Sequence, residues 1–221
     1  GKLSGRSLFL IDGKNADAYL LANKSGELFL IEASSPGIEV IELTTVDKTR
    51  TSIELILKDV NADLLSGSSD KLVIEKVLDA GRIMLAADTV GAAQVMLDKS
   101  VAYSLERKQF GRLIGSFQAV KHMCAEMAAE LEPCHSMIWH AAHCFDNVPE
   151  EARLMACQTK AHIAEVGQQI SKTATEVHGG MGFTDELGLH YWFKRIGLNR
   201  QLLGSPELIR EEAGRLQGFD Q

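Results

Sequence analysis

The sequence predicts an α+β protein, in which a partial β-barrel or sheet module is followed by an antiparallel four-helix bundle. Two observations lead to this prediction. Up to about residue 62, apolar residues come in short runs separated by turn-forming residues, which is typical of strands. Beyond residue 69 they recur every three or four positions over much longer stretches, which is typical of amphipathic helices. We therefore expect two domains, over residues 1–65 and 66–221.

Five short runs rich in Leu, Ile, Phe and Val are the predicted strands. They are Ser7–Asp12, Ala18–Ala22, Leu28–Glu32, Ile38–Leu43 and Ser52–Lys58. In the last run, apolar residues alternate almost regularly with Ser52, Glu54 and Lys58. Because successive side chains of a strand point to opposite faces, this alternation predicts a strand with one face in contact with water.

Helical periodicity continues through the rest of the chain, with recognisable punctuation. Pro133 lies inside the pattern of the second helix and is expected to kink or break it. The third helix is predicted to open at Pro149 and to stop at His178-Gly179-Gly180. The last is predicted to begin at Ser205-Pro206, with the serine as its cap. Long helices joined by short connections favour an antiparallel bundle.

Composition and charge exclude several classes of protein. The chain has 221 residues, of which 45% are hydrophobic and 24% charged, as in an ordinary globular protein. Its net charge of −7 and its interleaved basic and acidic residues argue against nucleic acid as a partner. No apolar run reaches the length of a membrane span. Four cysteines without a CxxC motif predict reduced thiols and a cytoplasmic protein. Because the chain begins with Gly1 rather than methionine, we expect its natural front to be missing.

We predict no metal site. His140, His143 and Cys144 lie close together in sequence, but their spacing matches no common zinc pattern. We therefore expect these side chains to pack or to lie on the surface. Motifs of the GxSxG, P-loop and GxGxxG types are absent from the sequence as well.

Two stretches could carry chemistry. YSLERKQFGRLIGSFQ, residues 103–118, is either a helix end with Gly111 as its C-cap or a loop that offers Arg107 to a phosphate and Phe110 to an aromatic ring. The residues alone leave both interpretations open. In HGGMGF, residues 178–183, a helix end explains one glycine. The second glycine suggests that a ligand or a tightly packed neighbour approaches the backbone.

The two stretches, together with LLGSPE at residues 202–207, resemble the C-terminal half of the acyl-CoA dehydrogenase family. The resemblance extends along essentially the whole chain. Residues 1–62 are similar to the later strands of that family's middle β domain, and residues 69–221 to its C-terminal four-helix domain. It implies FAD bound at a subunit interface, an acyl-CoA thioester as substrate, and an electron-transfer flavoprotein or similar acceptor. It also implies a homo- or hetero-oligomer, either a dimer or a tetramer.

Position by position, the resemblance assigns ten residues to FAD binding and two to the CoA-thioester end of the substrate pocket. The FAD set is Arg107, Gln109, Phe110, Phe117, Gln118, Glu176, Gly179, Gly180, Ser205 and Glu207. The substrate set is Asp79 and Arg82. Within the FAD set, Arg107, Gln109 and Phe110 would meet the pyrophosphate and adenine. Gly179 and Gly180 would let the cofactor approach their backbone.

The catalytic base is where the sequence departs from the family. The family's reaction removes an α-proton with a glutamate whose pKa is raised by a dry pocket. The two positions from which members supply this glutamate correspond here to Leu203 and Gly81, and neither can accept a proton. We therefore assign no catalytic residue. Glu176 and Glu186 are candidate substitutes, and we expect Glu186 in the first turn of a helix that begins at Thr184.

We interpret the chain as a C-terminal fragment of an acyl-CoA dehydrogenase-family subunit that supports FAD binding and assembly without supplying the usual base. One alternative is an active dehydrogenase with a relocated base. The other is a flavin-free interaction module that keeps the bundle only as a dimerisation surface. Flavin absorbance of the full-length protein separates the second alternative from the other two.

Overall fold

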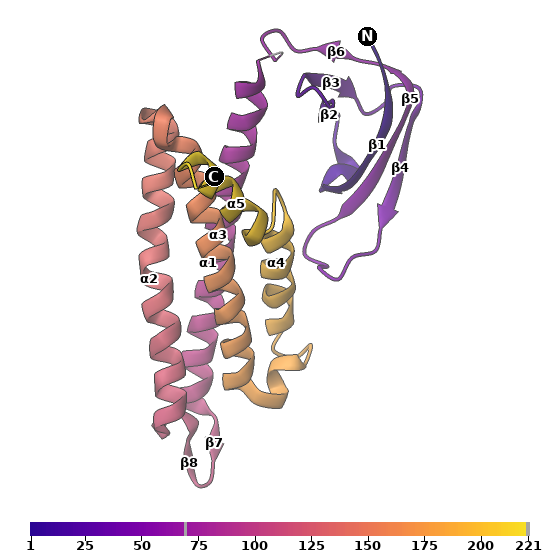
Figure 1. Ribbon diagram of the computed structural model, residues 1–221. Coiled ribbons are helices and arrows are strands. Elements are labelled where there is room, and N and C mark those ends of the chain that lie inside the picture. The colour runs from indigo at the N-terminus through magenta and orange to yellow at the C-terminus, as the bar shows by residue number, and fades with distance from the viewer. Residues whose placement is uncertain (69, 220–221) are drawn as a thin grey trace. The chain divides into compact units, whose positions relative to one another are not determined.

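Antiparallel strands make up the N-terminal part of the chain and helices the rest, so the predicted α+β fold class is confirmed (Figure 1). The computed structural model describes residues 1–68 and 70–219. These residues form two units, Gly1–Val77 and Leu78–Gln221.

Two three-stranded sheets form the first unit. One has the order β1 (Lys2–Ile11), β5 (Ser52–Asn61), β4 (Ile38–Leu43), and the other has the order β2 (Ala18–Ala22), β3 (Leu28–Glu32), β6 (Asp63–Leu64). All the strand pairs are antiparallel. The predicted runs coincide with β2, β3 and β4, whereas β1 and β5 are longer than predicted. Ile31, Ile53, Leu55 and Val60 are among the buried residues of the core.

The prediction that the last strand has one face in contact with water is wrong. Ser52 and Glu54 are both buried, and Glu54 is only 7% exposed. β5 is the central strand of its sheet, and Arg6 on the neighbouring β1 donates a hydrogen bond to the Glu54 carboxylate. A carboxylate can be buried when a cation pairs with it. The polar residues of an alternating pattern therefore identified one face of the strand but not whether water reaches it.

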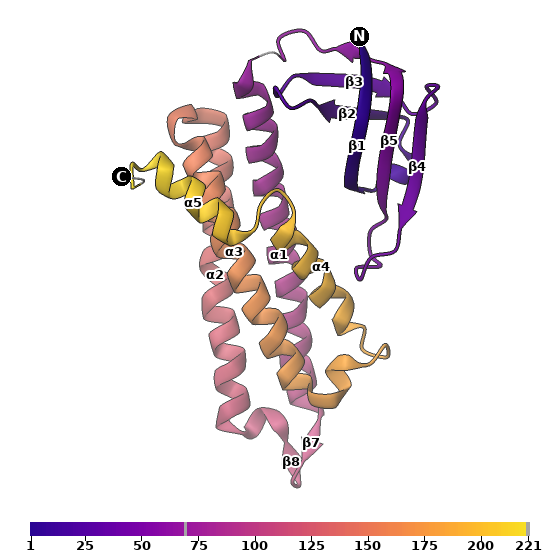
Figure 2. The ribbon, with the colours of Figure 1, turned by 45° about the vertical axis from the view of Figure 1, so that its right-hand side comes forward.

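Four helices of the second unit share one core. They are α1 (Lys71–Glu106), α2 (Gln118–Asn147), α3 (Pro149–His178) and α4 (Leu189–Gln201), and they run in alternating directions (Figure 1, Figure 2). Met96, Met127, Ile163 and Ile196 contribute one buried side chain from each helix. Within residues 1–68 and 70–219, none of the helices combines the length and the apolar character needed to cross a bilayer.

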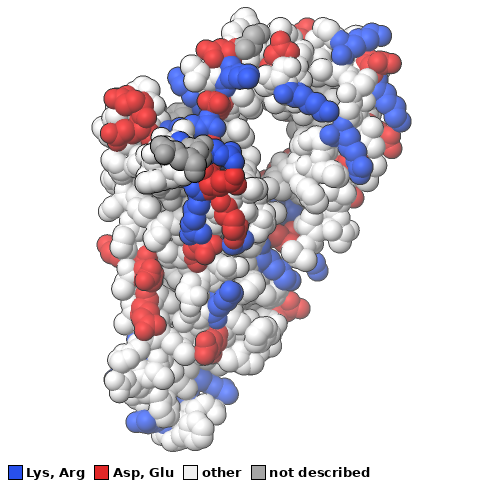
Figure 3. Space-filling model, in the orientation of Figure 1, with Lys and Arg blue, Asp and Glu red and all other residues white. Residues whose placement is uncertain are grey.

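Smaller elements complete the second unit. The hairpin of β7 (Lys108–Gln109) and β8 (Arg112–Leu113) leads from α1 toward α2, and a 3₁₀ segment, η3 (Gly179–Phe183), follows α3. α5 (Pro206–Leu216) packs on α3 through Ile209. On the face of this unit drawn in Figure 3, basic and acidic side chains alternate, as they do in the sequence.

Three predictions about helix ends need correction. Pro133 does not break α2, which is continuous. Pro133 and Ala129, whose carbonyl the proline leaves without its helical donor, are both exposed, so water can take the donor's place. Glu186 is not in a helix, because Gly188 in the left-handed region (φ +63°) precedes α4 and residues 184–188 form turns. Ser205 occupies the N-cap position of α5, but its side chain makes no capping hydrogen bond.

Candidate functional site

A cavity of about 430 Å³ lies where α1 and α3 end, and it contains half of the predicted FAD contacts. Its lining residues are Tyr103, Arg107, Gln109, Ile114, Glu176, Val177, His178, Gly179, Gly180 and Met181. Five of these are residues that the sequence predicted for FAD, and they come from the β7–β8 hairpin region and from the α3–η3 junction.

Local contacts hold the two sides of this cavity together. The Arg107 amide donates to the carbonyl of Tyr103 at 2.9 Å and ends the first helix, and the Ile114 amide donates to the carbonyl of Arg107 at 2.8 Å. Across the cavity, the Tyr103 ring stacks on the His178 ring with centroids 4.6 Å apart. The His178 Nδ1 lies 2.7 Å from the Ala174 carbonyl oxygen. The end of α1 is thereby fixed against the end of α3.

The two adjacent glycines have different explanations. Gly179 has φ +58° and ψ −139°, a backbone conformation open essentially to glycine alone. Gly180 has no such constraint, and a Cβ added there would meet nothing within 4 Å. At Gly182, by contrast, a Cβ would lie 2.8 Å from the carbonyl oxygen of Thr175. Packing within the chain thus requires glycine at residues 179 and 182 but leaves open space beside Gly180.

The hairpin presents an aromatic ring to its surroundings. Phe110 is 93% exposed and sits in the left-handed region at φ +52°. Its ring meets the edge of Phe117 with centroids 6.2 Å apart, and the Arg112 guanidinium lies 3.8 Å from the centre of the Phe117 ring. Gly111, with φ +76°, belongs to the hairpin turn, so the interpretation of Gly111 as the cap of the preceding helix is wrong. Gln118 is exposed at the start of α2.

The remaining predicted residues lie far from this cavity. Asp79 and Arg82 lie near the other end of α1, where Ser205 precedes α5 and Glu207 accepts a hydrogen bond from Arg200 at 2.6 Å. The 25 residues from Gly81 to the end of α1 at Glu106 correspond to about 37 Å at ~1.5 Å per residue. The twelve predicted residues therefore form two groups at the two ends of one helix.

Arg82 is the centre of the second group. It is 6% exposed, and its guanidinium donates to Glu212 on α5 at 2.7 and 3.2 Å and to Asp79 at 3.4 Å. Burial works against the charge, but the hydrogen bond and charge of Glu212 outweigh it and raise the pKa of Arg82. Glu212 also accepts from Arg153 on α3 at 2.6 Å. One carboxylate thereby joins three helices.

The two positions where the family places its base face each other. A Cβ added to Gly81 would lie 2.5 Å from Cδ1 of Leu203, so the leucine side chain covers the glycine. Leu203 itself is in the left-handed region at φ +56°, which costs a non-glycine residue about 1–2 kcal/mol. Arg82 Nε donates to the Leu203 carbonyl at 3.3 Å and helps to hold the turn. The backbone of the site is thus specialised, while the side chains at the base positions are apolar.

A buried lysine supports the same turn, and sequence reasoning did not single it out. Lys160 Nζ donates to the carbonyls of Asn199 at 2.7 Å and Arg200 at 3.3 Å, at the end of α4. Burial lowers its pKa to about 8, and the charges of Arg82 and Arg200 act in the same direction. Glu212 was missed as well. A lysine on the predicted bundle-facing stripe could have signalled Lys160, but no spacing relates Glu212 to Arg82 on another helix.

Neither candidate substitute base lies near Leu203. Cys157 on α3 is within 3.2 Å of Arg82, and Glu176 follows it by 19 residues, or about 28 Å along the helix. Glu186 precedes α4, whose 13 residues put about 20 Å between that turn and the turn of Leu203. Both carboxylates are exposed. Within one chain, neither can reach a substrate held at Leu203.

Comparison with known proteins agrees with this geometry. Residues 72–216 match the family model described as "Acyl-CoA dehydrogenase, C-terminal domain". The probable acyl-CoA dehydrogenase YngJ of Bacillus subtilis is 31% identical over 90% of this chain and 53% of its own length. The caffeyl-CoA reductase-Etf complex subunit CarC of Acetobacterium woodii is 28% identical over 83% of this chain and 52% of its own length. The solved structure titled "Tcur3481-Tcur3483 steroid ACAD G363A variant" superposes with a TM-score of 0.88 and 26% identity, over 99% of this chain and 60% of that one.

The chain belongs to the acyl-CoA dehydrogenase family, whose members are flavoproteins. The resemblance carried by the motifs at residues 103–118, 178–183 and 202–207 is thereby confirmed. The chain spans about half the length of the two curated relatives described above.

Proposed function

We propose that the full-length protein is a subunit of a flavin-dependent acyl-CoA dehydrogenase, that it binds FAD at a site shared between subunits, and that it does not itself supply the catalytic base. The observation that supports FAD binding best is the cavity beside Gly180. It combines an exposed cation, Arg107, with a backbone stretch that no side chain of the chain covers. Arg107 suits a phosphate, and open backbone suits the close approach of a cofactor.

Sharing between subunits follows from the separation of the two residue groups. Arg107 and Gly180 lie at one end of the bundle, and Ser205 and Glu207 lie near the other, about 37 Å away along α1. One dinucleotide cannot touch both groups of one chain. We therefore assign the two groups to different FAD molecules, each of which would be completed by another subunit. Bound FAD would supply the hydride acceptor of the reaction.

The residues of this chain would then bind and position rather than transfer a proton. Arg107 and Gln109 would hold the pyrophosphate, and Phe110 would offer its exposed ring to the adenine. Near the other end, Arg82 and Asp79 would form the wall of the thioester pocket. The arrangement suits a heteromeric enzyme in which a partner subunit carries the base. The Tcur3481–Tcur3483 enzyme, whose title joins two such names, is a relative with this kind of composition.

Two other functions find less support. An active dehydrogenase with a relocated base would need Glu176 or Glu186 to reach the substrate, and both lie about 20 Å or more from the turn of Leu203. A flavin-free interaction module would have no use for an open backbone at Gly180. An electron-transfer flavoprotein is the proposed acceptor, because CarC is named as part of an Etf complex. Four unpaired cysteines favour a reducing compartment such as the cytoplasm.

Replacing Arg107 with alanine tests the FAD proposal. The change should weaken FAD binding by about 1.5–3 kcal/mol, because it removes a charge-assisted contact to phosphate. Flavin content per chain, read from absorbance of the purified full-length protein, is the measurement. Lys108→Ala is the matched control, since Lys108 is an equally exposed neighbouring cation that does not line the cavity. Equal flavin content in wild type and Arg107→Ala would contradict the assignment.

Gly180→Ala and Gly182→Ala should separate binding from folding. A methyl group on residue 180 meets no atom of the chain, so the free energy of unfolding should change by less than about 1 kcal/mol while FAD affinity falls about tenfold or more. A methyl group on residue 182 would overlap the Thr175 carbonyl and should destabilise the fold by about 1–3 kcal/mol. Denaturant titration and flavin titration of both variants provide the comparison. Undiminished flavin binding by Gly180→Ala would show that the cofactor does not approach there.

The chain should also self-associate or bind a homologous subunit. Trp139 is 78% exposed and Met84 is 72% exposed, although large apolar side chains on the helices of a monomer are usually covered. The family resemblance implies paired bundles, so the buried interface should exceed the ~1,600 Å² of a standard complex. Light scattering at micromolar concentration measures the mass. A monodisperse monomer, alone and with its partner subunit, would be incompatible with a shared FAD site.

A further inference from the structure

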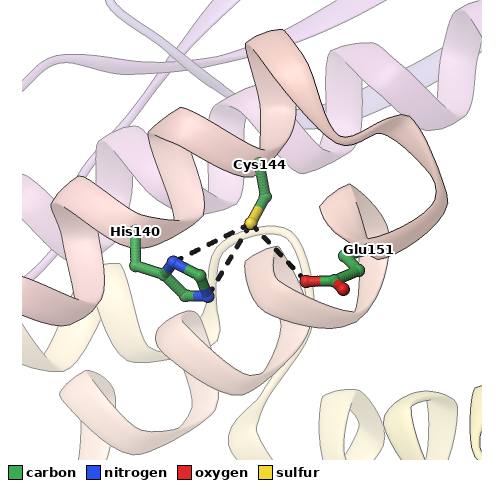
Figure 4. Close-up of side chains that lie close together, drawn as sticks. All are labelled: His140, Cys144 and Glu151. Carbon is green, nitrogen blue, oxygen red and sulfur yellow. Dashed lines mark hydrogen bonds between the residues drawn. The ribbon is translucent and has the colours of Figure 1, made fainter.

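Three potential metal ligands meet at the corner between α2 and α3 (Figure 4). The Cys144 sulfur lies 3.7 Å from Nε2 of His140 and 4.0 Å from Oε2 of Glu151. The sulfur lies between the imidazole ring and the carboxylate, as the close-up shows. One ligand atom from each of the three residues lies within 4.8 Å of the other two.

These separations are close to those of a four-coordinate zinc site. Zinc binds thiolate sulfur at ~2.3 Å, imidazole nitrogen at ~2.0–2.1 Å and carboxylate oxygen at ~2.0–2.2 Å. In a tetrahedron, those bond lengths put the sulfur about 3.6 Å from either of the other two ligand atoms. The observed 3.7 and 4.0 Å need to contract by no more than a few tenths of an ångström. Side-chain rotation alone can supply that.

The backbone already places the three residues for this purpose. His140 and Cys144 are four residues apart on α2 and therefore occupy the same face of the helix. Glu151 is in the first turn of α3, and only Val148 separates the two helices. The Val148 amide donates to the Cys144 carbonyl at 2.9 Å, and the Glu151 amide donates to the Val148 carbonyl at 3.0 Å. The corner that brings Glu151 to Cys144 is thus fixed by its own hydrogen bonds.

We propose that His140, Cys144 and Glu151 bind a divalent transition-metal ion, with Zn²⁺ as the best fit and water in the fourth position. One sulfur, one nitrogen and one oxygen ligand suit a borderline ion, whereas Mg²⁺ and Ca²⁺ prefer oxygen ligands alone. The thiolate and the carboxylate together neutralise the charge of the ion. Coordination releases the thiol proton to solvent.

Burial at the site favours a bound ion that solvent can still reach. Cys144 is 1% exposed, whereas His140 and Glu151 are both exposed. The ion could therefore enter past the imidazole and the carboxylate and end against the shielded sulfur. Burial, with the charges of Glu151 and Glu150, raises the pKa of the Cys144 thiol, so without an ion this sulfur stays protonated. Sequence spacing did not suggest this site, because Glu151 belongs to the next helix and lies outside the His/Cys patterns of common zinc motifs.

The bound ion would hold the two longest antiparallel partners of the bundle together at one end. It would act as a cross-link between α2 and α3, independent of whether the protein binds flavin. Since the ion binds the folded protein only, zinc should raise the midpoint of thermal unfolding in a concentration-dependent way.

Metal titration of the full chain tests the proposal. Wild-type protein, freed of metal with a chelator, should bind one Zn²⁺ per chain in competition with a chromogenic chelator. With Co²⁺ in place of zinc, it should show sulfur-to-cobalt charge transfer in the near ultraviolet. Each of His140→Ala, Cys144→Ser and Glu151→Gln should weaken zinc binding by about 10- to 100-fold, at least the loss that follows from removing a supporting partner of a metal ligand. Cys144→Ser should also abolish the charge-transfer band.

Each variant has a matched control on the same elements. His143→Ala, Cys124→Ser and Glu150→Gln remove the same three side-chain types from positions outside the cluster, and all three should bind zinc as the wild type does. Circular dichroism of every variant establishes that the fold is retained. Absence of stoichiometric zinc binding by the wild type, or equal losses in variants and controls, would overturn the proposal.

Discussion

Replacing Leu203 with glutamate should create or raise acyl-CoA dehydrogenation in the full-length, flavin-loaded protein. A positioned general base contributes about 10²–10⁴-fold, and an unassisted α-proton is a poor acid at neutral pH. The position is favourable for a base, because Leu203 lies on a turn held by Arg82 and its side chain covers Gly81, which offers no competing group. Apolar surroundings should raise the pKa of the introduced carboxylate and make it a better base.

Arg82 should not capture the new carboxylate. Its guanidinium is already engaged by Glu212 and Asp79, and it reaches residue 203 through the backbone carbonyl alone. The introduced glutamate would therefore stay available for the substrate α-carbon. This argument depends on Glu212, a residue that no motif of the family indicated.

Flavin bleaching on anaerobic addition of a panel of acyl-CoA thioesters measures this gain. Leu203→Gln is the matched control, since it has nearly the same shape and cannot accept the proton at neutral pH. Leu202→Glu is the second control, because it puts a carboxylate one residue away on the same turn. Rapid bleaching of the unsubstituted protein without a partner subunit would refute the premise that this chain lacks a base. Equal bleaching by the glutamate and glutamine variants would locate the base elsewhere.

Local sequence signals predicted much of the fold because they act over a few residues. The bounds of β2, β3 and β4 and the end of α3 at His178 follow from apolar runs and from glycine and turn chemistry. The same kind of reasoning failed at Pro133 and Glu186. At Pro133 solvent exposure removed the cost of the lost hydrogen bond, and at Glu186 a left-handed glycine delayed the next helix.

The contacts that define both sites join residues distant in sequence. Family resemblance indicated Arg107 and Gly180, and the shared cavity brings them together. Neither resemblance nor periodicity could place Glu212 beside Arg82, 130 residues away. Glu54 was misjudged for a related reason, since its burial depends on Arg6 in another strand. Charge pairs across elements are set by tertiary packing, which composition and spacing do not encode locally.

Arg82→Met should destabilise the chain by about 3 kcal/mol at neutral pH, within the range for breaking a buried ion pair. Methionine can fill the volume, but it cannot donate to Glu212, Asp79 or the Leu203 carbonyl. Arg153→Met is the matched control. Arg153 is more exposed, and its loss leaves Glu212 paired with Arg82, so it should cost about 1 kcal/mol or less. Denaturant unfolding of both variants and the wild type gives the comparison.

Acid should narrow the gap between wild type and Arg82→Met. Burial alone would raise the pKa of Glu212, but the hydrogen bond and charge of Arg82, assisted by Arg153, lower it below its ordinary value of 4.5. A carboxyl whose folded-state pKa is depressed adds stability above its unfolded-state pKa and loses it as pH falls through the folded-state value. The wild type should therefore lose stability below about pH 4.5 more steeply than Arg82→Met does. A gap that stays constant on acidification, or an equal cost for Arg153→Met, would show that Arg82 stabilises the fold by packing rather than through its charge pair with Glu212.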